Sequence, residues 1–292
     1  MKYLVIGSSG LMGSTFLDMI PDTIGVDEKT VDITSSASVE DYFKKNTDNF
    51  DAVINFAAYT NVDGAEKERG EEGGLVWKIN TEGPKNLNDV CRRYGKFLLH
   101  ISTDFIFSGG KTDPGPYDEN HKIPDLSDEI SWYGWTKNQG ERQVDTSKHA
   151  IVRTAYPFRK ESYGLKKDYV HGILDLFDED KLFPLFTDQI LTPILLEEMI
   201  PVLVNIVENR KLGIFHVVSA DTTTPFEFGS YLIEKARGKT NVVEKGSMEE
   251  FLKAPGRTPR PRLGGLNSQK TQESLGMKFK TWQEMVDEFV KG

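Results

Sequence analysis

The sequence predicts an α/β protein built on a doubly wound parallel sheet, with a smaller, α-rich C-terminal lobe. In the first half of the chain, short apolar runs alternate with longer helical patterns, which is typical of βαβ units. The apolar runs predict strands at residues 3–7, 23–27, 51–56, 97–102 and 150–154. Apolar residues at three- and four-residue spacing predict helices at residues 11–20, 38–45, 75–94 and 133–144.

The second half of the chain has a different pattern. A stretch rich in Lys, Asp and Phe runs to Phe186, and a helix at 195–208 and a strand at 213–218 then rejoin the sheet. The last seventy or so residues predict helices at 225–237 and 248–253, a short strand near Asn241, a loop rich in Pro, Arg and Gly, and two amphipathic helices ending at Lys291. We therefore expect one domain of residues 1–155 and about 189–219, and a substrate lobe of about 156–188 and 220–292.

The composition excludes several classes of protein. A formal net charge of -9 argues against a nucleic-acid-binding protein, because such surfaces are basic. The single cysteine, Cys91, excludes an intramolecular disulfide and fits a reducing compartment. The N-terminal apolar stretch is too short for a signal peptide, and no run reaches the roughly eighteen apolar residues of a membrane span. We expect a cytoplasmic protein, with no metal site because no His/Cys cluster has ligand spacing.

A glycine motif lies directly after the first predicted strand and before the first helix. Glycines at such a turn let the backbone approach a pyrophosphate, which the N–H groups and dipole of the helix N-terminus attract. The motif predicts a Rossmann-type dinucleotide site formed by Gly7, Gly10, Leu11, Met12 and Gly13. The spacing is GxxGxxG where the usual pattern is GxGxxG, and the alternative is a plain strand-to-helix turn.

Asp27 ends the second predicted strand, twenty residues after Gly7. A carboxylate at this position accepts hydrogen bonds from the adenosine ribose hydroxyls and repels a 2′-phosphate, so it favours NAD over NADP. The neighbouring Lys29 leaves NADPH open, and the alternative for Asp27 is a solvated loop carboxylate. We therefore predict NADH or NADPH as the cofactor.

Three residues form the predicted catalytic group. Thr103 follows the predicted strand at 97–102, where it can hydrogen-bond a reacting oxygen. Tyr133 and Lys137 are four residues apart on a predicted helix, so the ammonium lies on the same face as the phenol and can stabilise a phenolate. A Tyr-x-x-x-Lys pair alone is common by chance, but together with the glycine motif and Thr103 it indicates redox chemistry.

Longer segments then match a known family. Residues 55–66 read NFAAYTNVDGAE, residues 100–109 read HISTDFIFSG and residues 133–137 read YGWTK, and Arg153-Thr154, Asp188-Gln189 and Arg260-Pro261 follow in the expected order. The chain resembles the extended short-chain dehydrogenase/reductase superfamily, and within it the dTDP-4-dehydrorhamnose reductase family. The chain departs from that family's usual residues at Phe105 and at Ala155-Tyr156, which the resemblance places in or beside the sugar site.

The resemblance implies reduction of the C4 keto group of a dTDP-linked 6-deoxysugar. Hydride would come from the nicotinamide, Tyr133 would donate the proton, Lys137 would hold the nicotinamide ribose and Tyr133, and Thr103 would orient the carbonyl. The resemblance places Asp32 and Ile33 near the adenine and Ala57, Ala58 and Tyr59 along the cofactor. It implies a substrate site that includes Thr103, Asp104, Phe105, Tyr156 and Arg260. Arg260 also lies in the Pro/Gly-rich loop, where a guanidinium can grip a diphosphate or stay solvated.

Two other functions stay open at this point. An epimerase or dehydratase of the same superfamily would keep Tyr133 and Lys137 but hold its NAD through turnover. A non-catalytic regulatory subunit, resembling the beta subunit of methionine adenosyltransferase, would share the fold. Residues 174–177 and 181–186 are interpreted as a lobe or subunit contact, which leaves a homodimer open.

Overall fold

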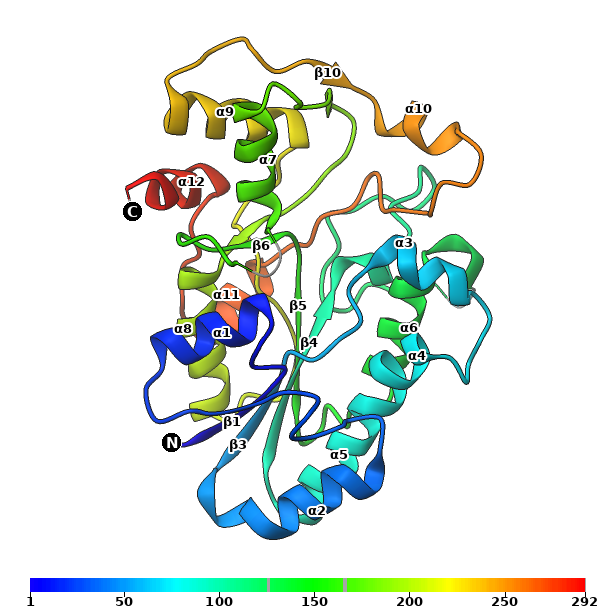
Figure 1. Ribbon diagram of the computed structural model, residues 1–292, viewed down its shortest axis with the longest axis vertical. Coiled ribbons are helices and arrows are strands. Elements are labelled where there is room, and N and C mark those ends of the chain that lie inside the picture. Colours follow the sequence, from blue (N-terminus) through cyan, green and yellow to red (C-terminus); the bar gives the residue numbers. More distant parts are fainter. Residues whose placement is uncertain (125–126, 165–166, 292) are drawn as a thin grey trace. The chain divides into compact units, whose positions relative to one another are not determined.

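The fold is described from a computed structural model, which covers residues 1–124, 127–164 and 167–291 (Figure 1). Its main feature is a six-stranded sheet with the order β2-β1-β3-β4-β5-β9. The pairs of β1 with β2, β1 with β3 and β3 with β4 are parallel. The strands are β1 Tyr3–Ile6, β2 Ile24–Val26, β3 Ala52–Asn55, β4 Phe97–Thr103, β5 Ala150–Thr154 and β9 Gly213–His216. The predicted α/β class with a doubly wound parallel sheet is confirmed.

The chain reverses its direction of travel across the sheet beside β1. It moves from β1 outward to β2, and then returns past β1 to β3. In sheets of this kind the crevice outside the carboxyl ends of the strands, at the reversal point, is where ligands bind. The order of the strands therefore puts the glycine motif, which follows β1, at the position expected of a cofactor site.

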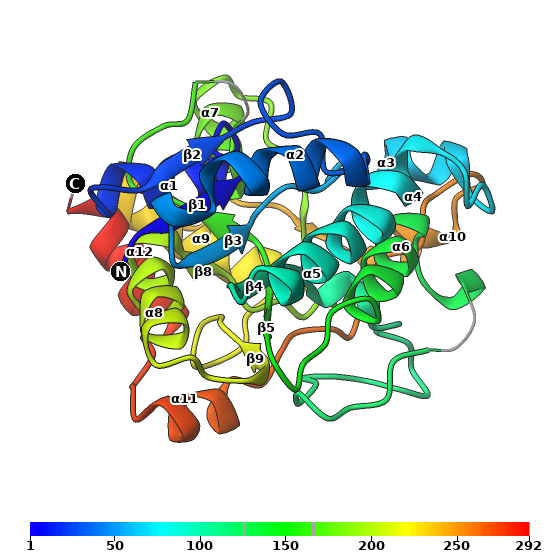
Figure 2. The same ribbon diagram turned by 90° about the horizontal axis from the view of Figure 1, so that it is seen from below.

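Helices cover both faces of this sheet. Figures 1 and 2 show α2, α5 and α6 on one face and α1 and α8 on the other. Apolar side chains of α2, α5 and the strands form one core cluster that includes Phe43, Leu87 and Leu98. The helices are α1 Leu11–Met19, α2 Ser36–Asn46, α5 Gly83–Arg93, α6 Trp132–Glu141 and α8 Leu196–Glu208. As predicted, α8 and β9 return the chain to the sheet after residue 195.

The predicted single helix at 75–94 is interrupted. It consists of α4 Leu75–Trp77, a π-helical turn at Lys78–Glu82 (η3) and α5. Pro84 explains the interruption, because proline has no N–H to donate to the carbonyl of residue 80 four positions back. The carbonyl of Asn80 lies instead against α6, where a Cβ placed on Gly140 would come within 2.0 Å of it.

Of the helices longer than two turns, one was missing from the sequence prediction. Residues Tyr169–Asp178 form α7, although the prediction assigned no helix to this Lys-, Asp- and Phe-rich stretch. The side chain of Asp168 caps it by accepting hydrogen bonds from the backbone N–H groups of Val170 and His171, both at 3.0 Å. Val170, Ile173 and Leu174 are buried at helical spacing, so the missed signal was an N-cap followed by an apolar stripe.

The remaining elements are short strands and helices. β6 Pro157–Phe158 pairs with β8 Ile194–Leu195, and β7 Leu185–Phe186 pairs with β10 Lys245–Gly246, which is the strand predicted near Asn241. The helices are α9 Pro225–Arg237, α10 Met248–Lys253, α11 Gln269–Leu275 and α12 Trp282–Val290, together with the short α3 Val62–Ala65. In the described ranges, none of the helices combines the length and apolar character that crossing a bilayer requires.

The chain divides into two compact units. Unit 1 comprises Met1–Ile106, Ile123–Arg153 and Ile200–Phe215, and unit 2 comprises Phe107–Lys122, Thr154–Met199 and His216–Gly292. The sequence prediction assigned residues 107–122 to the domain that contains the sheet. They group with unit 2 because their backbone pairs there: Tyr117 N–H donates to Gly265 O at 3.0 Å, and Asn267 N–H donates to Tyr117 O at 2.7 Å. Residues 189–199 join unit 2 through β8 in the same way.

A buried ion pair links the end of α6 to β5 within unit 1. The Nε and Nη2 atoms of Arg153 donate to the carboxylate of Glu141 at 3.0 and 2.8 Å, and the two side chains are only 2% and 5% exposed. Because the carboxylate sits at the C-terminal end of α6, where the helix dipole disfavours negative charge, the guanidinium is needed to balance it.

Replacement of Arg153 by Met is therefore expected to lower the free energy of unfolding by about 3–5 kcal/mol, because it leaves the Glu141 carboxylate buried without its cation. The double variant Arg153→Met/Glu141→Leu should recover most of that loss, because two apolar side chains of similar volume replace the pair. Urea unfolding followed by circular dichroism measures both. A double variant as unstable as the single one would show that the packing, and not the unpaired charge, is responsible.

Candidate active site

The turn after β1 has a geometry that only glycines allow. Gly7 has a φ of +79°, and a Cβ there would lie 2.7 Å from Ala57 N. A Cβ on Gly13 would lie 2.3 Å from Gly7 O, so α1 can pack this closely on the turn only without one. The structure therefore assigns two of the three predicted glycines a clear steric requirement, and it brings the turn against the segment that begins at Ala57.

The N-terminus of α1 is suited to an anion. Gly10 is its N-cap and supplies no side-chain acceptor, and the first turn contains no acidic residue. The first N–H groups of a helix have no partner within the helix, and the helix dipole adds partial positive charge there. The backbone of Leu11, Met12 and Gly13 thus presents donors that fit the pyrophosphate of a dinucleotide.

Asp27 and Asp32, the two acidic residues predicted to lie near the cofactor, accept hydrogen bonds from their own loop after β2. Oδ1 of Asp27 accepts hydrogen bonds from the N–H groups of Lys29 and Thr30, at 3.1 and 3.2 Å. Oδ1 of Asp32 accepts from Thr34 N–H at 2.9 Å. Ile33 is buried, and its side chain packs on Gly83 of α5, so it belongs to the core. Contacts of Asp27 and Asp32 with a ribose, and of Ile33 with an adenine, stay predictions.

Residues 57–59, which follow β3, are held by two buried amides. Ala57 N–H donates to Asn55 Oδ1 at 3.0 Å. Tyr59 N–H donates to Asn80 Oδ1 at 2.9 Å, and Asn80 Nδ2 donates back to Tyr59 O at 3.2 Å. Ala58 lies between these two anchor points. Asn55 and Asn80 were not predicted as site residues, although both hold the predicted cofactor segment in place.

The structure brings the three predicted catalytic residues together inside unit 1. Thr103 ends β4 and is 7% exposed, and Tyr133 and Lys137 of α6 are 9% and 2% exposed. The hydroxyl of Thr103 donates to Oδ1 of Asp104 at 3.2 Å, and Thr103 is close enough to Tyr133 to lower the pKa of its hydroxyl. The ring of Phe105 meets that of Tyr133 edge-on at 5.7 Å between centroids. Lys137 Nζ donates to Ile101 O at 2.7 Å.

Burial shifts the pKa of every ionisable group in this cluster. It raises the pKa of Tyr133 to about 12, against the opposing effect of the hydrogen bond from Thr103. It lowers the pKa of Lys137 to about 8 and raises the pKa of Asp104 to about 7. Neighbouring groups whose pKa values are displaced in this way are characteristic of functional sites. At neutral pH, Tyr133 is thus a proton donor beside a protonated lysine.

The start of α6 is fixed by contacts from three segments. The side chain of Ser131 caps the helix by accepting from Gly134 N–H at 3.1 Å, and Oε2 of Glu66 accepts from Trp132 N–H at 2.9 Å. A Cβ on Gly134 would lie 2.0 Å from Phe105 O, so α6 touches the backbone that follows β4. Among the described residues no metal-binding group occurs, and Glu66 serves the N-terminus of α6.

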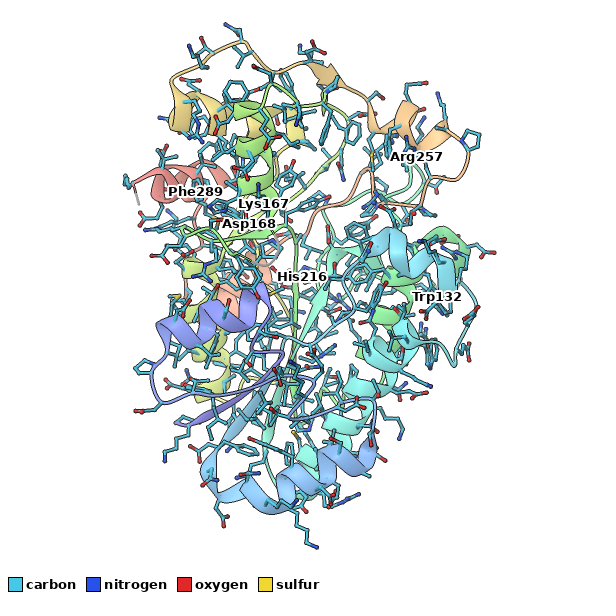
Figure 3. The ribbon with its side chains drawn as sticks, viewed as in Figure 1. Trp132, Lys167, Asp168, His216, Arg257 and Phe289 are labelled. Atoms are coloured by element: carbon cyan, nitrogen blue, oxygen red, sulfur yellow. The ribbon has the colours of Figure 1, made fainter. Side chains whose placement is uncertain are left out.

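Trp132, labelled in Figure 3, stacks on Trp77 at 6.1 Å between ring centroids and is 2% exposed. Trp132 therefore has a packing role in unit 1. The aromatic pair joins α4 to the N-terminal turn of α6 and so helps to hold Tyr133, the next residue.

Two predicted substrate residues belong to unit 2. Tyr156 has a φ of +45°, its hydroxyl accepts from Gln189 Nε2 at 2.9 Å, and its ring meets that of Tyr169 edge-on. Arg260 lies in the loop between α10 and α11 and is half-buried. In the same loop, Arg257 lies over the ring of Phe251 (Figure 3). Roles for Tyr156 and Arg260 in substrate binding stay predictions.

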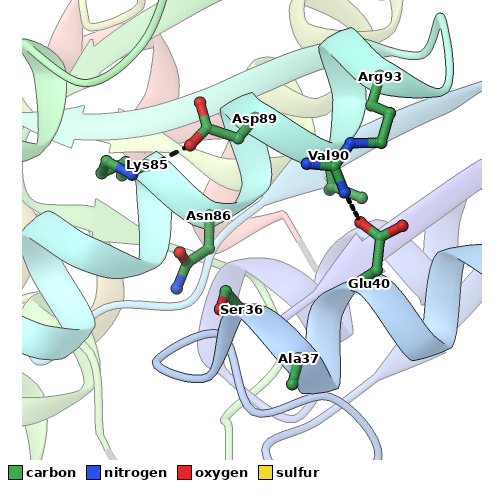
Figure 4. Close-up of a pocket in the computed structure, with 8 residues that line it drawn as sticks. All are labelled: Ser36, Ala37, Glu40, Lys85, Asn86, Asp89, Val90 and Arg93. Atoms are coloured by element: carbon green, nitrogen blue, oxygen red, sulfur yellow. Dashed lines mark hydrogen bonds and ion pairs between the residues drawn. The ribbon is translucent and has the colours of Figure 1, made fainter.

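A surface pocket between α2 and α5 contains none of the predicted site residues (Figure 4). Its charged side chains pair with one another: Lys85 with Asp89 at 3.1 Å, and Arg93 with Glu40. Because these charges are already compensated and the pocket lies on other helices than α6, it is not part of the catalytic cluster. The lining residues are Ser36, Ala37, Glu40, Lys85, Asn86, Asp89, Val90 and Arg93.

Comparison with known proteins gives a consistent result. A family model described as RmlD substrate binding domain matches residues 1–292. The dTDP-4-dehydrorhamnose reductase of Aggregatibacter actinomycetemcomitans is 28% identical over 98% of this chain and 97% of its own length. That of Mycolicibacterium smegmatis is 27% identical over 99% of this chain and 85% of its own length. The crystal structure of a Bacillus anthracis dTDP-4-dehydrorhamnose reductase in complex with NADP has a TM-score of 0.84 and 26% identity, covering 99% of this chain and 98% of that one.

The glycine turn yields a direct test. Gly13→Ala is expected to weaken NAD(P)H binding by about tenfold to a hundredfold, because relieving a contact of 2.3 Å must displace α1 from the turn. Titration of NAD(P)H fluorescence measures the affinity.

Gly172→Ala is the matched control. Gly172 lies inside α7 with no atom near its missing Cβ, so alanine there should leave NAD(P)H affinity unchanged and add about 1 kcal/mol of stability. Equal affinities for the Gly13→Ala variant and the wild type would contradict a cofactor site at this turn.

Proposed function

The chain belongs to the RmlD substrate binding domain family, and on this premise we propose that it reduces the C4 keto group of dTDP-4-dehydrorhamnose to give dTDP-rhamnose. It is an NAD(P)-dependent oxidoreductase. The observation that carries the proposal is the buried cluster of Thr103, Tyr133 and Lys137 at the carboxyl end of β4, in a chain with relatives of that activity over nearly its whole length.

The residues of unit 1 account for the proton half of this reaction. When bound, NAD(P)H supplies the hydride that forms the new C–H bond at the keto carbon. The hydroxyl of Tyr133 gives its proton to the keto oxygen, which becomes the alcohol. The pKa of about 12 keeps Tyr133 protonated before the reaction, so it acts as an acid.

Lys137 and Thr103 prepare Tyr133 for this step. A phenolate forms as the proton leaves, and the Lys137 ammonium on the next turn of α6 stabilises it. The Thr103 hydroxyl, which lowers the pKa of Tyr133, favours the phenolate and is placed to share the keto oxygen. Because water is excluded from all three side chains, these interactions are stronger than they would be at a surface.

The cofactor site takes a nicotinamide dinucleotide at the glycine turn. Asp27 favours NADH, whereas the adjacent Lys29 is a cation that a 2′-phosphate can use. The Bacillus anthracis relative was crystallised with NADP. A direct comparison of the two cofactors is therefore part of the first assay.

Cellular location and oligomeric state are the two remaining properties of the enzyme. The single cysteine is buried and free, which supports the cytoplasm as its location. The predicted homodimer stays a prediction. Leu174 is buried within unit 2, so part of the run at 174–177 makes a contact inside the lobe, whereas Phe183 is 55% exposed.

Tyr133→Phe is expected to lower turnover of dTDP-4-dehydrorhamnose by about 10²- to 10⁴-fold while NAD(P)H still binds, because only the proton donor is lost. Oxidation of NADH and of NADPH, followed by absorbance, measures turnover and identifies the cofactor. Tyr42→Phe on α2 is the control and should behave as the wild type. Wild-type protein that binds NAD(P) but does not turn over this sugar would refute the proposed substrate. NAD that co-purifies and stays unchanged through turnover would favour an epimerase or dehydratase.

The pKa of Lys137 predicts the pH dependence. Because burial lowers that pKa to about 8, the ammonium is present below this pH and is lost above it, so kcat/KM for the reduction should fall as the pH rises through about 8. Lys137→Arg should be slower but without this alkaline decline, because a guanidinium stays protonated. If kcat/KM of Lys137→Arg declined at the same pH, a group other than Lys137 would be responsible for the decline.

A further inference from the structure

His100 is a buried histidine that the reaction described above does not use. It is fully buried on β4, three residues before Thr103. Its Nε2 lies 3.4 Å from Lys137 Nζ, and its Nδ1 lies 3.0 Å from Nδ2 of Asn55. Asn55 and His100 are directly paired in the register of β3 and β4.

The hydrogen bonds around Asn55 determine which nitrogen of His100 carries its proton. The backbone N–H of Ala57 can only donate, and it lies 3.0 Å from Asn55 Oδ1. The amide is therefore oriented with its Nδ2–H group toward His100. Since that group also can only donate, His100 Nδ1 must accept, and the proton of the neutral imidazole is on Nε2.

This tautomer points an N–H group at Lys137. An ammonium has no lone pair and cannot accept from it, whereas an uncharged amine can. The ammonium form therefore has Ile101 O, at 2.7 Å, as its acceptor and makes no hydrogen bond with the imidazole, whose Nε2 lies 3.4 Å away. The fixed tautomer thus restrains the position of Nζ and disfavours its protonation.

The charged groups around Lys137 act in both directions. On α6, Glu141 favours the ammonium, and Tyr133 is uncharged at neutral pH. From β5, Arg153 balances Glu141 through their ion pair. Asp104, which follows β4, acts on Tyr133, and Glu66, in the 3-10 helix Glu66–Glu68, binds the N-terminus of α6. His100 on β4 faces Nζ directly, and burial together with Lys137 keeps the pKa of His100 well below its usual value.

We propose that Asn55 and His100 form a positioning pair for Lys137, in which the amide fixes the Nε2–H tautomer of the imidazole and the imidazole sets the position and proton affinity of Nζ. The inference rests on the proposed function for its catalytic meaning, because Lys137 is the group that stabilises the Tyr133 phenolate. The tautomer of His100 and its effect on the pKa of Lys137 can both be measured without any substrate.

The first experiment determines the tautomer. Long-range ¹⁵N–¹H correlation spectra of the full-length protein labelled at histidine distinguish Nδ1–H from Nε2–H, and the signal that is absent in His100→Gln identifies His100. We expect the neutral Nε2–H form throughout the neutral range. In Asn55→Asp, whose carboxylate can only accept, we expect the Nδ1–H form. An Nδ1–H tautomer or an imidazolium in the wild type would overturn the proposal.

The second experiment measures the pKa of Lys137 by ¹³Cε NMR titration, with Lys137→Arg used for assignment. In Asn55→Asp the imidazole presents a lone pair to the ammonium, and the new carboxylate adds attraction, so the pKa of Lys137 should rise by about one to three units. The double variant Asn55→Asp/His100→Leu keeps the charge but has no imidazole, and it should show a smaller rise. Equal shifts in the two variants would overturn the role of the tautomer.

Kinetics then separate this proposal from the proposed function. His100→Leu should lower kcat by about tenfold to a hundredfold, since small misplacements of a catalytic group cost this much, with less effect on KM. His100→Gln, which can present an amide N–H near the Nε2 position, should restore most of kcat. A wild type without reductase activity would refute the proposed function while the NMR results still decide the positioning pair. Equal kcat values for the Leu variant and the wild type would overturn the catalytic part of the inference.

Discussion

The buried ammonium of Lys137 is the constraint on which much of unit 1 depends. Its side chain is 2% exposed, so its charge has to be compensated by fixed groups of the protein. The carbonyl of Ile101 accepts its hydrogen bond, and Glu141 one turn along α6 favours its charge. Glu141 is itself buried and requires Arg153 on β5. This one buried charge thus depends on the last turn of α6 and on the neighbouring strand, so the proposed catalytic group and the stability of unit 1 rest on the same contacts.

Close backbone approach is the second requirement, and glycines meet it on both sides of the site. Gly7 and Gly13 bring α1 and residue 57 against the turn after β1, and Gly134 brings α6 against the carbonyl of Phe105. Side chains at these positions would separate the elements by more than a catalytic hydrogen bond tolerates. Polar side chains complete the arrangement, because Asn55, Asn80 and Glu66 each satisfy a backbone N–H of a segment that lines the site. The backbone of the site, and not only its side chains, is thus held by hydrogen bonds.

The local signals in the sequence predicted the strands of the sheet and the identity of Thr103, Tyr133 and Lys137, because apolar periodicity and fixed spacing are local properties. The break in the helix at 75–94 was foreseeable from Pro84 alone, and α7 from Asp168 and the apolar stripe that follows it. The role of His100 could not be predicted in this way. A histidine within an apolar run is typical of a satisfied core residue, and its partners, Asn55 and Lys137, come from a neighbouring strand and a helix that only the fold brings beside it.

The displaced pKa values of the cluster have one origin and opposite consequences. Burial disfavours every charge, so it keeps Tyr133 as the protonated phenol that the reduction needs and simultaneously weakens the hold of Lys137 on its own proton. Deeper burial would raise the pKa of Tyr133 further. It would also lower the pKa of Lys137 until this lysine lost the charge that must stabilise the phenolate. The site therefore needs groups that adjust Lys137 independently of Tyr133. Glu141 on α6 raises the proton affinity of Lys137, and the proposed Nε2–H group of His100 on β4 opposes that effect.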